Sequence, residues 1–143
     1  MKGLYPLLSH STLLVVGIIV MGMVIISFSN FLSRTEIDLV NVELNYIADY
    51  TKDKIFEIYN LANSSSEYFS GNFKLKLPEK IGNRKYTISF QQNTLSACVS
   101  VENELIEVTR LLNIDATFNG TSYMPASINI EKLNGNISIS LVD

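Results

Sequence analysis

The sequence predicts an α+β protein in which one long N-terminal helix, its first half transmembrane and its second half amphipathic, packs on a six- to seven-stranded antiparallel β-sheet or small β-sandwich. Three observations support this fold class. The 30 residues from Leu4 to Ser33 contain no Asp, Glu, Lys or Arg. Apolar residues then recur every three or four positions as far as Ala62, which is the period of a helix with one buried face. Beyond residue 72 the apolar period shortens to two, as in half-buried strands.

The uncharged run 4–33, called the stem below, is long enough to cross a bilayer. As a helix it would measure about 45 Å, whereas the hydrocarbon core is about 30 Å thick. A conventional secretory signal has an apolar core of only about 7–15 residues, so cleavage of that kind is not expected. Lys2 and the α-amino group flank the first end, which predicts a cytoplasmic N-terminus and an extracytoplasmic remainder. His10 is expected at the interface or in a subunit contact.

The segment 34–63 continues the stem as an amphipathic helix. Its apolar stripe, interrupted by one Thr, consists of Ile37, Val40, Leu44, Ile47, Thr51, Ile55, Ile58 and Ala62. No Pro or Gly occurs between Met23 and Ser70, so we expect a single helix from near residue 5 to near residue 62. The outer face is expected to be solvated or to meet a complementary neighbour, and its acidic residues are Glu36, Asp38, Glu43, Asp49, Asp53 and Glu57.

Residues 64–72 are rich in Ser, Asn and Gly and are expected to form a turn-rich connector, followed by an extracytoplasmic β head over 73–143. Gly82-Asn83 and Asn119-Gly120 indicate turns within the head. The expected strands alternate around Phe73, Leu75 and Leu77, then Tyr86, Ile88 and Phe90, then Leu95, Ala97, Val99 and Val101, and less regularly around Ile106, Val108, Ile114, Ala116 and Phe118.

The C-terminal hairpin is specific enough for its register to be predicted. With Asn134-Gly135 as a two-residue turn, apolar residues oppose apolar residues on one face and polar residues oppose polar ones on the other. The expected pairs are Leu133 with Asn136, Ile130 with Ile139, Ile128 with Leu141, Asn129 with Ser140 and Glu131 with Ser138.

The composition contains no pattern typical of catalysis or cofactor binding. The chain has 11 basic and 14 acidic residues and a net charge of −3, which is too mild a balance to indicate nucleic-acid binding. One His and one Cys exclude a two-His metal motif, and no Gly-rich phosphate loop or G-x-S-x-G occurs. We therefore expect neither an enzyme nor a bound cofactor or metal. Cys98 cannot form an internal disulfide and is expected on a polar strand face, either inert or as an intermolecular or reactive thiol.

Three N-x-[ST] sequons, at Asn63, Asn119 and Asn136, lie in or beside expected turns. On the expected topology all three are outside the membrane. They are candidate N-glycosylation sites, although each could also occur by chance in a chain rich in Asn and Ser.

A basic cluster lies in the expected first hairpin of the head, and it consists of Lys74, Lys76, Lys80, Arg84 and Lys85. Lysines protect edge strands from unwanted pairing, which is the simplest interpretation. Alternatively, the cluster could pair with the acidic helix face of a neighbouring subunit. Binding of DNA or an acidic glycan is disfavoured because no aromatic residues are interleaved with the basic ones.

Lys2-Gly3 followed by Leu4-Tyr5-Pro6-Leu7-Leu8 resembles the class III signal of archaeal type IV pilin-like proteins, in which a basic residue and Gly precede the cut and the apolar segment is retained. The resemblance extends to the order of a long helix and then a β head. It implies that residues 1–3 are a leader, which a prepilin peptidase would cut between Gly3 and Leu4.

The resemblance implies a structural function. Subunits would reside in membrane lipid until the pilus assembly machinery incorporates them into a helical homo- or hetero-polymer. This polymer would be an extracellular filament that can mediate cell adhesion. Its core would be a bundle of stems, in which Gly17, Gly22, Ser27 and Ser29 allow close packing. The competing interpretation is a single-pass membrane-anchored exoplasmic module, similar to the β-sandwich stator subunits of the archaellum, whose head contacts a partner such as the surface layer.

Overall fold

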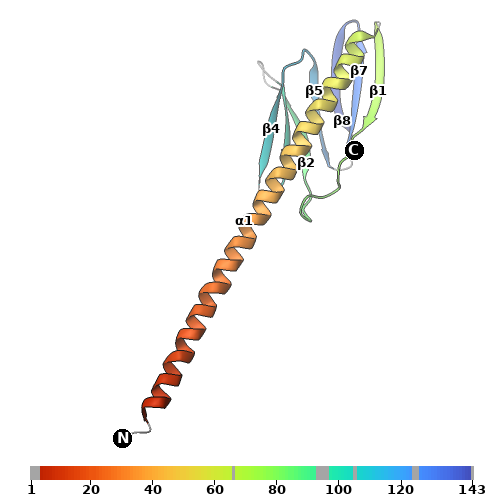
Figure 1. Ribbon diagram of the computed structural model, residues 1–143. Coiled ribbons are helices and arrows are strands. Elements are labelled where there is room, and N and C mark those ends of the chain that lie inside the picture. The colour runs from red at the N-terminus through yellow and green to blue at the C-terminus, as the bar shows by residue number, and fades with distance from the viewer. Residues whose placement is uncertain (1–3, 66, 93–96, 105, 124–125, 143) are drawn as a thin grey trace. The chain divides into compact units, whose positions relative to one another are not determined.

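A computed structural model of the chain describes residues 4–65, 67–92, 97–104, 106–123 and 126–142. Within these residues it contains one helix and eight strands (Figure 1). Their bounds are α1 Leu4–Ser64, β1 Tyr68–Lys74, β2 Thr87–Gln92, β3 Ala97–Glu102, β4 Glu107–Leu112, β5 Thr117–Asn119, β6 Thr121–Tyr123, β7 Ser127–Leu133 and β8 Asn136–Val142. The chain divides into two compact units, of which the first ends at Asp38 and the second is Leu39–Asp143.

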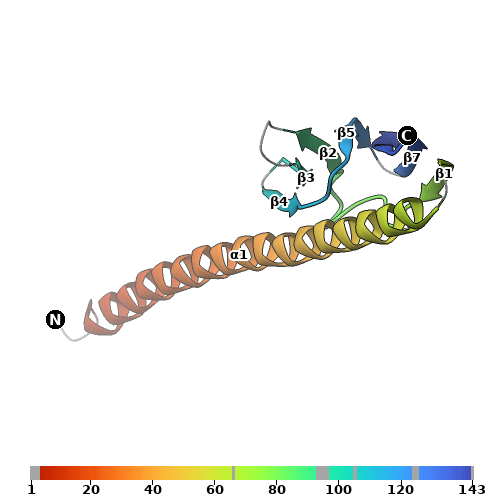
Figure 2. The ribbon, with the colours of Figure 1, turned by 90° about the horizontal axis from the view of Figure 1, so that it is seen from above.

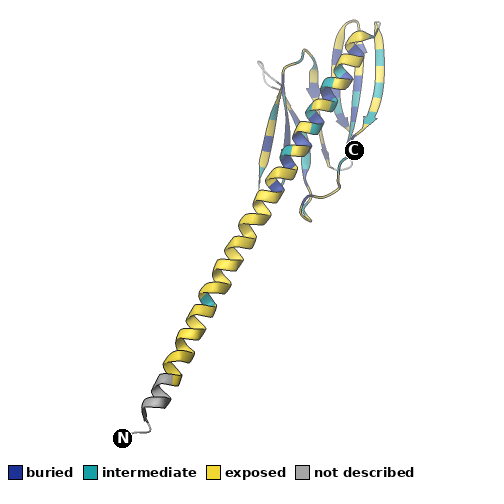
Figure 3. Ribbon diagram, viewed as in Figure 1, coloured by how far each residue is buried: buried dark blue, intermediate teal, exposed yellow. Residues whose placement is uncertain are grey.

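The first unit is the N-terminal part of α1. The prediction of a single helix from near residue 5 to near residue 62 is confirmed, with ends at Leu4 and Ser64. From His10 to Asp38 every residue is exposed except Gly22, which is half-buried (Figure 3). A helix satisfies its backbone polar groups internally, as the interior of a bilayer requires. The helix is long and apolar enough to cross a membrane, so the chain is compatible with a single-pass anchor.

In the second unit, the remaining turns of α1 bury one stripe against both sheets. The buried residues are Val40, Leu44, Ile47, Ala48, Thr51, Ile55, Ile58 and Ala62. This is the stripe that the helical period predicts, with Ala48 added and Ile37 excluded, because Ile37 precedes the second unit and is 45% exposed. The stripe belongs to one core that also contains the inward side chains of the strands. The amphipathic half of α1 is therefore an internal element of the head.

The strands form two four-stranded sheets that lie next to each other along α1 (Figures 1 and 2). Their orders are β1-β7-β8-β5 and β4-β3-β2-β6. The prediction of six or seven strands in a purely antiparallel arrangement is therefore wrong on two points. The described residues form eight strands, and β5 pairs in parallel with β8.

The parallel pair arises where the chain passes from one sheet to the other at Gly120. Asn119-Gly120 was expected as a turn, but the chain bends there and continues, so that β5 ends one sheet and β6 ends the other. Gly120 has a φ of +113°, and a Cβ at this position would lie 2.8 Å from the carbonyl oxygen of Leu141. Only glycine combines this backbone conformation with so close an approach.

The C-terminal hairpin has the predicted register. Strands β7 and β8 pair Leu133 with Asn136, Ile130 with Ile139, Ile128 with Leu141, Asn129 with Ser140 and Glu131 with Ser138. Asn134 and Gly135 have φ angles of 51° and 85°, as a type I′ turn requires.

The first strand of the head begins earlier than the alternation of Phe73, Leu75 and Leu77 indicated. Strand β1 covers Tyr68–Lys74, which shortens the expected connector 64–72, and β1 pairs with β7 instead of β2. The first hairpin is therefore a wrong prediction. Its place is taken by the segment 75–86, in which Gly82-Asn83 forms a local turn closed by an Ile81–Arg84 bridge. Pro78 has no N–H to donate to a ladder, which favours this irregular path.

The C-terminal end of α1 is capped by a lysine from β7. Lys132 Nζ donates to the carbonyl oxygens of Ala62, Asn63 and Ser65 at 3.1, 3.3 and 3.0 Å. The lysine is only 8% exposed, and α1 has no basic residue in its own last turn. Carbonyls at a helix C-terminus lack helical partners and carry partial negative charge. Lys132 therefore satisfies these groups and opposes the helix dipole at the same time.

Lys132→Met retains the length of the side chain and removes all three hydrogen bonds. We expect the free energy of unfolding to fall by about 2–3 kcal/mol, because hydrogen bonds to charged groups contribute about 1.5–3 kcal/mol each and water replaces some of them. A urea titration of the full chain in detergent micelles, followed by near-UV circular dichroism of the tyrosines, measures the change. The control is Lys74→Met, at an exposed lysine on β1, where a change below about 0.5 kcal/mol is expected. Equal losses in the two variants would contradict the capping role.

Candidate functional site

The stem presents a continuous apolar surface. Its large apolar side chains between Leu13 and Leu32 are 51–67% exposed, and no charged residue interrupts the run. In water such a surface is strongly unfavourable, so it must be covered by lipid or by other apolar helices. The stem is therefore the candidate site of interaction.

Small residues lie on two nearly opposite faces of the stem. At about 100° per residue, Gly22 and Ser29 are only about 20° apart around the helix axis, whereas Gly17 and Gly22 are separated by about 140°. Around the same axis, Ser27 lies about 80° from Gly17. The mean direction of Gly17 and Ser27 is about 170° from the mean direction of Gly22 and Ser29. Neither glycine has a heavy atom within 4 Å of an added Cβ. The isolated chain thus leaves room for larger residues at both positions.

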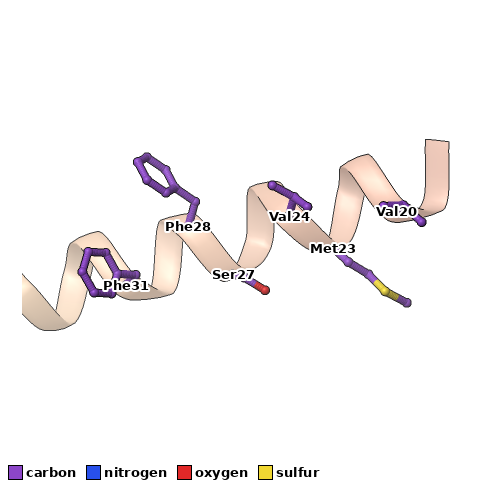
Figure 4. Close-up of a pocket in the computed structure, with 6 residues that line it drawn as sticks. All are labelled: Val20, Met23, Val24, Ser27, Phe28 and Phe31. Carbon is purple, nitrogen blue, oxygen red and sulfur yellow. The ribbon is translucent and has the colours of Figure 1, made fainter. Parts of the chain in front are cut away.

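The Ser27 face contains a shallow apolar hollow, shown in Figure 4. Val24 and Phe28 project on one side of it and Met23 on the other. Its complete lining is Val20, Met23, Val24, Ser27, Phe28 and Phe31. A small side chain between larger ones is the shape that admits a side chain from a neighbouring helix.

In the head, the guanidinium of Arg110 joins β4 to α1. Its Nε donates to Asp49 Oδ1 at 2.6 Å, and its Nη2 donates to Asn45 Oδ1 at 2.6 Å and to Asp49 Oδ2 at 3.3 Å. The hydrogen bond from Arg110 lowers the pKa of the Asp49 carboxyl, and the same bond raises the pKa of Arg110. A carboxylate held in this way is a poor proton acceptor, so the cluster is a structural clamp.

Other chemistry-bearing side chains of the head are dispersed. No group of three or more His, Cys, Asp or Glu side chains that could hold a metal ion occurs in the described ranges. Cys98 is a half-buried free thiol whose Sγ lies 3.5 Å from the carbonyl oxygen of Gln91. It points away from the core between the buried Ala97 and Val99, on the strand face that the alternation predicts.

The three sequon asparagines are all exposed. Asn63 lies in the last turn of α1, Asn119 ends β5 and Asn136 begins β8. Lys132 contacts the carbonyl of Asn63 and lies in the β7–β8 hairpin that Asn136 continues, so Asn63 and Asn136 lie at the same end of the head.

The predicted basic cluster is divided between a strand and a loop. Lys74 ends β1, and Lys76, Lys80, Arg84 and Lys85 lie in the segment 75–86. The four lysines are exposed, whereas the half-buried Arg84 donates from Nη1 to Glu104 Oε2 at 3.1 Å. Since β1 is an edge strand, protection of an edge explains Lys74 alone.

The predicted leader residues Lys2 and Gly3 lie outside the described residues, and Leu4 is the first residue of α1. Comparisons of the chain with protein-family models, curated proteins and solved structures found no match.

Asp49→Asn keeps the shape of the side chain and removes its charge. We expect the variant to be less stable at pH 7 by under about 1 kcal/mol, because the Asp49 side chain is 57% exposed and solvent screens its attraction to Arg110. The pKa of Asp49 is lower in the folded state than in the unfolded state. The charged carboxylate therefore stabilises the fold fully above the unfolded-state pKa of about 3.9, and this stabilisation is lost as the pH falls through the folded-state pKa. Urea unfolding midpoints of the wild type and the variant should therefore differ at pH 7 and converge as the pH falls through the folded-state pKa of Asp49.

The control for this comparison is Asp53→Asn, which removes one negative charge at another exposed position of α1. A difference between the wild type and Asp49→Asn that persists unchanged at low pH would show that the ion pair does not cause it.

Proposed function

We propose that this chain is a structural subunit of a type IV pilus-like surface filament, a major or minor pilin, which assembles through its stem. The observation that carries the proposal is the exposed apolar stem with small residues on two nearly opposite faces. The tripeptide Met1-Lys2-Gly3 before it, with its resemblance to a class III leader, supports the same conclusion.

The two faces favour an assembly in which each stem has several neighbours. A helix dimer needs only one close-packed stripe, whereas a helix in the core of a filament is surrounded. Burial of apolar side chains contributes little when a helix moves from lipid into a bundle of similar helices, because both surroundings are apolar. Close packing at Gly17 and Ser27 on one side, and at Gly22 and Ser29 on the other, would provide the missing stabilisation.

The arrangement of α1 supports a filament subunit in a second way. The same helix supplies the stem and the buried stripe of the head. A stem that moves from the bilayer into a filament would therefore bring the head with it, without a separate linker. In this proposal the N-terminus starts in the cytoplasm, the head is outside, and the exposed Asn63, Asn119 and Asn136 are available for glycosylation.

A membrane-anchored binding module, similar to an archaellum stator subunit in contact with the surface layer, would also place the stem in lipid. Such an anchor has lipid alone around it. It gives no reason for glycines at positions where a larger side chain would fit, although glycine lowers helix stability by about 0.8–1.0 kcal/mol relative to alanine. This comparison favours the filament.

Co-expression of the full chain with a prepilin peptidase tests the proposal. We expect the intact mass to fall by the mass of Met1-Lys2-Gly3, with a new N-terminus at Leu4, because the peptidase recognises the basic residue and the glycine before the cut. Mass spectrometry of the purified membrane fraction measures this loss. The double variant Lys2→Gln and Gly3→Val should retain the full mass.

A matched control is Lys52→Gln, which removes one positive charge from α1 far from the leader and should leave cleavage unchanged. The chain could instead stay uncut in membranes that contain an active prepilin peptidase and be recovered only from the membrane fraction. That result would contradict the filament proposal and favour the anchored module.

A further inference from the structure

The segment 74–86, called the lysine loop below, carries four exposed lysines with no ion-pair partner among the described residues, namely Lys74, Lys76, Lys80 and Lys85. Its one acidic residue is Glu79, and Glu104 faces it through an ion pair with Arg84. The lysine loop therefore has a local excess of positive charge in a chain whose net charge is −3.

The lysine loop is held in a defined conformation. Ile81 is fully buried, and Ile81 and Arg84 exchange backbone hydrogen bonds of 2.9 and 2.8 Å across the Gly82-Asn83 turn. The Tyr86 hydroxyl donates to the carbonyl oxygen of Pro78 at 2.6 Å, and the Tyr86 side chain is 2% exposed. The lysines thus project from a fixed frame, and binding through them needs little ordering of the backbone.

The lysine loop lies against the beginning of the head's helical stripe. A Cβ placed on Gly82 would lie 3.1 Å from Val40 Cγ2, and Val40 is the first buried residue of α1. Val40 is the seventh residue after Ser33, the last residue of the stem, and α1 is continuous through both. Seven helical residues span about 10 Å, which is comparable with the Debye length in physiological salt.

We propose that the lysine loop binds the anionic headgroups of the membrane in which the stem is embedded. This rests on the membrane anchoring in the proposed function and does not require a filament. When the stem lies in a bilayer, the length of the chain keeps the loop within reach of the lipid surface. The stem is followed by Arg34 and then by Glu36 and Asp38, and the two carboxylates are repelled by an anionic surface. The lysines compensate for this repulsion and hold the head at the membrane.

Amine acetylation of the full chain in lipid nanodiscs, one copy per disc, tests the proposal. The discs consist of phosphatidylcholine alone or of phosphatidylcholine mixed with phosphatidylglycerol, and peptide mass spectrometry gives the rate at each lysine. We expect acetylation of Lys76, Lys80 and Lys85 to be about fivefold slower in the anionic discs, the factor that corresponds to the attraction of one lysine to such a surface. High salt should remove the difference. Lys52 and Lys54, farther along α1, are internal controls whose rates should not change.

A variant separates the loop from general effects of the lipid. Replacing Lys74, Lys76 and Lys80 together by Gln leaves Lys85 as a reporter, and its protection should fall to less than half of the wild-type value because each lysine adds to the attraction. Replacing Lys52 and Lys54 by Gln is the matched control and should leave the protection of Lys85 intact.

Equal rates in both kinds of disc would overturn the proposal. In discs prepared with several copies each, protection that arises there and not in single-copy discs, whatever the lipid charge, would also overturn it and would indicate binding to the acidic helix face of a second copy. A chain that fails to enter the discs would contradict the anchoring itself, and this result is distinct from failure of the loop alone.

Discussion

The structure depends on one constraint, which is that the apolar stem cannot remain in water. A single large apolar side chain contributes about 1.5–3 kcal/mol on full burial, and a domain of ordinary size is stable by only about 5–15 kcal/mol. The stem exposes a continuous row of such side chains between Leu13 and Leu32. Exposure of this row to water is therefore strongly unfavourable, and the stem is long and apolar enough to avoid it by crossing a membrane.

The head is built around the same helix that carries this constraint. Its two sheets share one core with the stripe from Val40 to Ala62, and two cations from distant strands fasten the helix at separate points. Lys132 caps the last turn, and Arg110 bridges to Asn45 and Asp49. Removal of the helix would leave both sheets without one side of their core, so the head and the amphipathic half of α1 form one folding unit.

The periodicity of apolar residues was sufficient to predict the elements whose residues interact locally. It failed to predict which strands pair when they are far apart in the sequence. The helix, its buried stripe and the register of the C-terminal hairpin follow from spacing in the sequence. Spacing does not predict the pairing of β1 with β7 or the parallel pairing of β5 with β8. Alternation of apolar residues identifies the buried face of a strand, but it does not identify the strand with which it pairs. The burial of Lys132 could have been predicted from the sequence, because Lys132 follows Ile128 and Ile130 at the alternating positions that face the core. The contact of Arg110 with Asp49 spans 61 residues and has no local signal.

The candidate site was also predictable in part. The small residues of the stem were identified from composition, but their division between two faces follows from helix geometry. In the filament proposed above, the stem exchanges lipid for other stems. Electron cryo-microscopy of material sheared from cells that express the chain tests it most directly. The account predicts filaments whose core is a bundle of stem helices, with Gly22 and Ser27 facing different neighbours. Absence of filaments, with the chain retained in membranes, or filaments in which the stems are not in contact, would contradict it.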